Sequence, residues 1–445
     1  MIFSFRHMGI GGNFSPFLRN IAKLVGGTVV GQLVTLAALP VLTRIYSPAE
    51  YGFAGLFAAV VVCITAVSTL RYDFAIPIPS RERVARQITA VALISALAVI
   101  VVVGAGALAL SFRFSLPAGL YAWQFIGLLL LAVATISFFN IGRGWATRKK
   151  EFGQLALTRV QQGVAGTSVQ IVLGMVGFGS AGLIIGQIVG QSAGAMRLWR
   201  LVPRPLSEGA IWAARRFRNF PIYDSWSGLL NVAGTQAPVM LFAAFFSPML
   251  VGYYAFATRL VAAPISLIGQ AAARVFLPHI IEANRSGSGA AAVLKLTSAL
   301  AYIGFPAFTL LAALSSPLVR ILFGEAWVPA SMIISWTALW AGWQLVASPL
   351  SVTLIGLEAQ KTNTLLQATL FTLRCLAILV GYWQGSEKMA IVLFSFASIL
   401  VYFAFILAVG RLVGIGTFRM IRPLFVPLFL SAVLYGSLQV LWPYP

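Results

Sequence analysis

Residues 88–110 read ITAVALISALAVIVVVGAGALAL, and no charged side chain interrupts this run. A helix that crosses the hydrocarbon core of a bilayer needs about 20 consecutive apolar residues. The run is therefore long enough to cross a membrane once. We interpret it as the centre of a membrane-spanning helix over residues 84–112.

Runs of the same kind make up most of the chain. Of its 445 residues, 60% are hydrophobic and 9% are charged, against roughly 45–50% and about 25% in soluble domains. This composition excludes a soluble protein and predicts an all-α polytopic membrane protein. Thirteen spans are predicted, at residues 20–45, 49–76, 84–112, 121–146, 154–177, 180–202, 221–246, 250–276, 291–316, 328–356, 362–383, 388–410 and 423–442.

The basic side chains are divided unevenly among the segments that join these spans. The chain has 31 Lys and Arg against 10 Asp and Glu, which gives a formal net charge of +21. Most of the basic residues fall into every second connecting segment, as the positive-inside rule describes. This pattern predicts a cytoplasmic N-terminus. It argues against nucleic-acid binding, which would gather the basic residues on one face.

Landmarks of the first six predicted spans recur 200 residues later in the next six. The pairs are Ser47 and Ser247, Pro48 and Pro248, Gly52 and Gly252, Ser115 and Ser315, and Pro117 and Pro317. Six spans return the chain to the same side of the membrane, so the two sets have the same orientation, as in transporters built from parallel repeats. We predict two parallel six-helix lobes, at residues 1–202 and 221–412, that form a V around a central cavity.

The remaining parts of the chain lie between and after these lobes. Residues 203–220 are a cytoplasmic basic linker in which Trp212 and Phe217 interleave with Arg215 and Arg216. This pattern fits a simple tether or an amphipathic helix on anionic lipid. Residues 413–445 supply the thirteenth span, an additional C-terminal helix outside the repeat.

Signs of catalysis are sparse. The two histidines, His7 and His279, stand far apart, and the few acids are scattered over separate loops. Catalysis usually needs positioned acid and base groups in one pocket. We therefore predict a membrane transporter that is not an enzyme, with no cofactor and no metal site.

Arginines within predicted spans are candidates for contact with a substrate, because an Arg at the bilayer centre costs about 2.5–3.5 kcal/mol on insertion scales. Arg374 lies near the middle of span 362–383. We interpret it as a fixed charge facing a watery cavity, with interhelical hydrogen bonding as the alternative. Arg259, near the outer start of its span, and Arg44, at the outer end of the first span, are weaker candidates of the same kind.

Other polar side chains stand where gates or sugar contacts are expected. Arg71 and Asp73 close the second span at its inner end, and Asp224 opens the seventh just after Pro221. We assign Arg71 to substrate binding and the two acids to a gate or ion coupling, although helix capping and simple ion pairing are alternatives. The candidates for hydrogen bonds to sugar hydroxyls are three intramembrane amides, Gln32, Gln236 and Gln367.

Three strings together resemble one family: PVLTRIYSPAEYG at 40–52, TLRYDFAIPIPSRERVA at 69–85, and the stretch from FRNFPIYDSWSGLLN at 217–231 to RVFLP at 274–278. The resemblance is to the Wzx-like flippases of lipopolysaccharide and exopolysaccharide biosynthesis. Their superfamily also contains multidrug exporters of the MATE type. The resemblance covers residues 15–412, and the thirteenth span lies outside it.

The resemblance implies a function in the bacterial inner membrane. It implies that the chain moves an undecaprenyl-diphosphate-linked oligosaccharide from the inner to the outer leaflet, with membrane lipid around it and a polysaccharide polymerase and other assembly proteins as partners. The family motif positions to which it carries over are Arg44, Arg71, Asp73, Pro221, Arg259 and Arg374. Many relatives carry an Asp where residues 235–237 read Thr-Gln-Ala here, which leaves ion coupling through that helix open.

Three alternatives follow from the same residues. A MATE-like exporter of small amphipathic molecules would need an acid at mid-depth, where this chain offers Arg374. A membrane glycosyltransferase or polymerase subunit would need larger outer loops. A peptidoglycan lipid II flippase would differ in its cargo alone.

Overall fold

The computed structural model describes residues 16–111, 122–357 and 359–441. Within these ranges the regular structure is helical throughout, which confirms the all-α prediction. The first half contains α1 (Pro16–Ala37), α2 (Leu39–Ile45), α3 (Pro48–Thr65), α4 (Tyr72–Ala75), α5 (Glu82–Ser111), α6 (Ala122–Arg148), α7 (Phe152–Met175), α8 (Gly179–Ser192) and α9 (Ala195–Trp199).

The second half follows a short helix, α10 (Ala210–Arg216), and a π-helix, η1 (Phe220–Asp224). Its elements are α11 (Ser225–Phe245), α12 (Pro248–Arg285), α13 (Gly289–Ala313), α14 (Ser315–Phe323), the 3₁₀ turn η2 (Glu325–Trp327), α15 (Ala330–Leu350), α16 (Val352–Gly356), α17 (Gln360–Trp383) and α18 (Glu387–Leu412). The last helix is α19 (Thr417–Leu441).

In the described ranges, ten helical segments are long and apolar enough to cross a membrane. The chain is therefore a multi-pass membrane protein. Each of the thirteen predicted ranges overlaps one or more helices in its described part. Three of them, 154–177, 180–202 and 328–356, are not among the ten. One of these three contains α8, which has 14 residues. The count of thirteen spans stays a prediction.

Several predicted spans are broken rather than continuous. In the range 49–76, α3 ends at Thr65 and turns lead to α4. Leu70 and Arg71 have φ values of 46° and 61° there, in the left-handed region. The range 180–202 breaks in the same way before Gly194, whose φ is 78°. Apolar periodicity misses these breaks because neither a charged residue nor a proline stands at residues 66–70 or 193–195 to mark the change in backbone direction.

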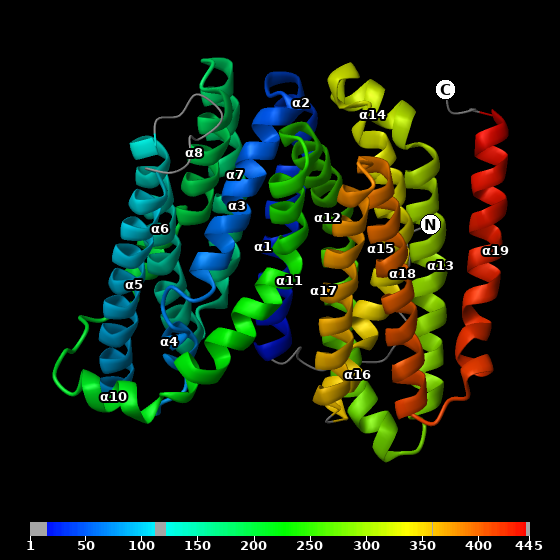
Figure 1. Ribbon diagram of the computed structural model, residues 1–445. Helices are drawn as coiled ribbons and strands as arrows, with labels where there is room; N and C mark the ends of the chain where they lie inside the picture. Colours follow the sequence, from blue (N-terminus) through cyan, green and yellow to red (C-terminus); the bar gives the residue numbers. More distant parts are fainter. Residues whose placement is uncertain (1–15, 112–121, 358, 442–445) are drawn as a thin grey trace.

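The two halves meet where α3 crosses α12 (Figure 1). A Cβ atom at Gly52 would overlap the carbonyl oxygen of Pro248, and one at Gly252 would overlap that of Pro48. Ser47 and Ser247 cap the two helices alike, each accepting a hydrogen bond from the backbone N–H three residues on. The predicted repeat landmarks therefore face each other. We call Gly52 and Gly252 the glycine crossing.

Aromatic side chains close the space beside the glycine crossing. The indole Nε1 of Trp327 donates to the carbonyl oxygen of Thr43 across the two halves at 2.8 Å. The same ring packs edge-on against Tyr51, with centroids 5.3 Å apart. Trp327 is fully buried. We call this closely packed region around Trp327 and the glycine crossing the sealed end. The landmarks Ser115 and Pro117 lie outside the described residues.

The linker is attached to the first half rather than hanging free. The Arg86 guanidinium donates to the carbonyl of Arg204 at 2.8 Å, and the Gln87 amide donates to that of Glu208 at 2.8 Å. On α10, Ile211 and Trp212 are exposed, with 73% and 55% of their surface accessible. Exposed apolar residues beside basic ones favour the predicted amphipathic helix.

The last helix lies at one edge of the molecule (Figure 1). It packs on α13 and, to a smaller extent, on α18. Long sections of it stay uncovered, because Phe418, Phe425 and Phe429 are exposed. Such residues suit contact with lipid tails.

Candidate functional site

Arg71 reaches across to the second half from the break between α3 and α4. Non-glycine residues in the left-handed region cost on the order of 1–3 kcal/mol and cluster at functional sites. Here the strained backbone aims the guanidinium group at α11, where it rests on Gly228; a Cβ atom at that position would overlap it. The Arg71 Nε lies 3.9 Å from the Asp224 Oδ2. The predicted residues Arg71 and Asp224 are therefore brought together.

A second arginine shares an aromatic ring with Arg71. The Cζ atoms of Arg71 and Arg143 lie 4.8 Å and 5.4 Å from the centroid of Phe74. Cations are attracted to ring faces at these distances. The Arg143 Nη2 lies 3.5 Å from the Oδ2 of Asp73. The Phe74 ring thus lies beside both guanidinium groups, and each of the two arginines has a carboxylate partner, Asp224 for Arg71 and Asp73 for Arg143.

Asp73 is held by two partners. Its Oδ1 accepts a hydrogen bond of 2.6 Å from the Thr69 hydroxyl, and its Oδ2 faces Arg143. The residue is 4% exposed. Asp224, by contrast, is half exposed. Asp73 is therefore fixed inside the first half, whereas Asp224 links the two halves.

Arg159 adds a third positive charge. This residue of α7 lies close enough to Arg143 for electrostatic repulsion between them. Its Nη1 donates to the Oε1 of Gln162 at 3.1 Å. The four ion pairs among the described residues do not include it. We call Arg71, Arg143 and Arg159 the arginine cluster. Arg71 and Arg143 are each paired with one acid, and Arg159 is in none of the described ion pairs, so the cluster has one positive charge more than its two acids neutralise.

Arg374 lies elsewhere, enclosed within the second half. Its Cζ is 4.9 Å from the ring of Trp340, 4.8 Å from that of Phe394 and 5.8 Å from that of Tyr402. Its Nε donates to the Ser398 hydroxyl at 2.9 Å. The residue is 9% exposed. These contacts to α15 and α18 favour the interhelical alternative over the predicted open cavity.

The other two predicted arginines lie near the sealed end. The Nη1 of Arg259 on α12 donates to the Tyr51 hydroxyl on α3, at 3.4 Å. Arg44 is exposed in the last turn of α2, where a cation suits the negative end of the helix dipole. Neither residue contacts the arginine cluster in the described structure.

The three predicted amides have different surroundings. The Oε1 of Gln32 on α1 accepts a hydrogen bond of 2.9 Å from the Ser266 hydroxyl on α12, so it joins the two halves. Gln236 on α11 donates to its neighbour Thr235 at 3.4 Å. Gln367 is exposed on α17. The sugar-contact role of all three stays a prediction.

The sequence analysis did not name Arg143 or Arg159 as candidates for contact with a substrate. Their place in a cluster depends on packing among α4, α6 and α7, which sequence spacing does not reveal. The sequence did offer one sign of their importance: both arginines lie within predicted spans, Arg143 in 121–146 and Arg159 in 154–177.

Comparison with known proteins shows the family of this chain. A sequence profile of the family described as "Polysaccharide biosynthesis protein" matches residues 41–332. The chain belongs to this family. The teichuronic acid biosynthesis protein TuaB of Bacillus subtilis (strain 168) is 24% identical over 156 residues. That alignment covers 34% of this chain and 32% of TuaB, so the chain matches about a third of the relative's length.

Superposition on solved structures shows the fold of this chain. The lipid II flippase MurJ in an inward closed conformation superposes with a TM-score of 0.73, at 13% identity and over 92% of each chain. An inward-facing MATE family multidrug resistance transporter gives 0.54, at 16% identity and over 94% of each chain. The chain thus has the fold of these two membrane proteins.

Proposed function

We propose that this chain is a flippase that moves an undecaprenyl-diphosphate-linked oligosaccharide from the inner to the outer leaflet of the bacterial inner membrane. The observation that carries the proposal is the excess positive charge of the arginine cluster beside the contact between Arg71 and α11. A diphosphate is anionic, and guanidinium groups bind phosphate oxygens through paired hydrogen bonds. The family and the teichuronic acid relative support a glycan cargo.

The mechanism we propose is alternating access. The glycine crossing and Trp327 seal one end, which we assign to the outer side from the positive-inside pattern. The arginine cluster then lies toward the inner side, where the diphosphate enters. Rocking of residues 1–202 against residues 221–412 would break the seal and turn the site outward. The polyprenyl tail stays in lipid throughout.

The arginine cluster is to be tested with Arg159→Gln, because Arg159 can be changed without leaving a buried acid unpaired. Hydrogen bonds to charged groups contribute about 1.5–3 kcal/mol, so we expect flipping to fall by about 10- to 100-fold. The measurement is the flipping rate of a fluorescent lipid-linked oligosaccharide in proteoliposomes. Arg197→Gln, at an exposed arginine of α9, is the control and should keep the wild-type rate. Equal rates in both variants would remove the cluster from the mechanism.

Two other cargoes are to be considered, lipid II and organic cations, and the first can be tested in the same assay. Lipid II is the second candidate, because the MurJ structure superposes at a TM-score of 0.73. Flipping of lipid II at the rate of the oligosaccharide carrier would support it. Export of organic cations is disfavoured, since Asp73 and Asp224 each lie within 4.0 Å of an arginine nitrogen. Complementation of flippase-null strains distinguishes O-antigen from exopolysaccharide cargo.

A further inference from the structure

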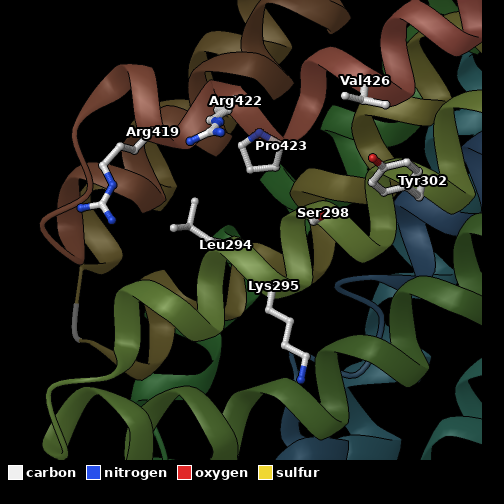
Figure 2. A pocket seen from close by; sticks show the side chains of 8 residues that line it. All are labelled: Leu294, Lys295, Ser298, Tyr302, Arg419, Arg422, Pro423 and Val426. Carbon is white, nitrogen blue, oxygen red and sulfur yellow. The ribbon is translucent and has the colours of Figure 1, made fainter.

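A cavity of about 470 Å³ opens between α13 and α19, away from the arginine cluster. Figure 2 shows its two walls. Arg419, Arg422 and Val426 come from α19, and Leu294, Ser298 and Tyr302 come from α13. Lys295 also lines it, with its ammonium group extending away from the two arginines (Figure 2).

The two arginines of this cavity lie at the N-terminal end of α19, where positive charge is unfavourable. Arg419 and Arg422 stand in the first two turns of α19, which has no acidic residue in its first turn. The N-terminal end of a helix carries partial positive charge, so cations there are repelled and anions are stabilised. The four ion pairs among the described residues include neither arginine. An anion in the cavity would relieve this repulsion.

Apart from Lys295 and Ser298, the rest of the cavity lining consists of aliphatic and aromatic side chains that lie farther along the helices. Val426 is four residues beyond Arg422, a rise of about 6 Å, and is 52% exposed. Tyr302 faces the same space from α13 and is 49% exposed. A charged mouth followed by an apolar wall matches a molecule with an anionic head and a hydrocarbon tail.

We propose that this cavity binds an anionic phospholipid of the surrounding membrane. Its phosphate would lie at Arg419 and Arg422, and one acyl chain would run past Tyr302 and Val426. Basic pockets between spanning helices on the cytoplasmic side hold anionic headgroups in this way. The site is distinct from the proposed cargo site because α19 lies at the edge of the molecule (Figure 1) and contacts α13 and α18 rather than the first half.

Native mass spectrometry of the purified full chain with phosphatidylglycerol tests the site. We expect Arg419→Gln/Arg422→Gln to lose one phosphatidylglycerol adduct that the wild type keeps. Arg197→Gln/Arg200→Gln removes two arginines with the same spacing at the other half, and it should keep the adduct. Phosphatidylcholine should bind equally to all three proteins. Equal loss in both double variants would show a general charge effect and would overturn the proposal.

Two further arms distinguish a lipid in this cavity from a lipid bound elsewhere and from a free anion. Ser298→Phe fills the cavity while leaving both arginines, and it should also lose the adduct; an unchanged adduct would place the lipid elsewhere. Inorganic phosphate at millimolar concentration should not displace the lipid, and displacement would assign the site to a free anion. Because the readout is binding without transport, a wrong cargo assignment would leave these results unaffected.

Discussion

At Gly228 the backbone of α11 comes so close to the Arg71 guanidinium that a Cβ atom would overlap it. We therefore expect Gly228→Ala to displace Arg71 from Asp224 and to lower flipping at least tenfold. Gly234→Ala is the matched control on the same helix, because nothing lies within 4 Å of a Cβ atom there. The measurement is the flipping rate in proteoliposomes. Equal rates in the two variants would show that the contact between Arg71 and α11 is dispensable.

Arg374 was predicted to be a fixed charge facing a watery cavity, with interhelical hydrogen bonding as the alternative. The structure surrounds its guanidinium group with three aromatic rings. The rings come from α15 and α18, so their convergence could not be deduced from spacing along α17. The cage favours a contribution to packing.

Substitution of Arg374 separates stability from substrate binding. Lysine keeps the charge but loses the flat guanidinium that spans the rings and reaches Ser398. Since cation–π contacts contribute about 2 kcal/mol when desolvated, we expect Arg374→Lys to lower the unfolding free energy by about 1–2 kcal/mol. Thermal unfolding in detergent measures this loss. An unchanged stability together with lost flipping would instead support the predicted phosphate contact.

The contact between α3 and α12 depends on small residues at one point. A side chain at the glycine crossing would push the two helices apart, because Gly52 packs against the backbone of Pro248. We expect Gly52→Ala to loosen the sealed end. In a chain with Cys63 and Cys375 replaced, Thr43→Cys should then react with an impermeant maleimide several times faster than it does without the glycine change.

The control for this experiment is Gly127→Ala on α6, where a Cβ atom meets nothing within 4 Å. It should leave the labelling of Thr43→Cys unchanged. Thr43 is 5% exposed in this conformation, so fast labelling without the Gly52 change would contradict the sealed end.

The sequence predicts where the helices lie along the chain better than it predicts which helices contact one another. Long apolar runs such as residues 88–110 correspond to helices because every side of such a helix needs an apolar neighbour. The landmarks around Ser47 and Ser247 predicted a repeat. That the same landmarks form the contact between the halves required the tertiary structure. The break at Leu70 and Arg71 was missed for a related reason, since backbone dihedral angles leave no periodic signal.

On the scale of the whole molecule, the charge of the cargo sets the response to the membrane potential. With the interior negative, each negative charge moved outward gains about 2.3 kcal/mol per 100 mV. We expect outward flipping of the diphosphate-linked lipid to accelerate when vesicles are made negative on the side of the N-terminus, and to slow when the potential is reversed. Initial rates at imposed potassium diffusion potentials measure this. Rates independent of the sign would exclude a potential-driven step.

The contact at the glycine crossing is reciprocal: Pro48 meets Gly252, and Pro248 meets Gly52. The two sides of this contact carry the same pattern, Ser-Pro followed four residues later by Gly, at residues 47–52 and 247–252. A side chain added at either glycine would meet backbone atoms of the other helix. The contact therefore leaves no room for a larger residue on either helix.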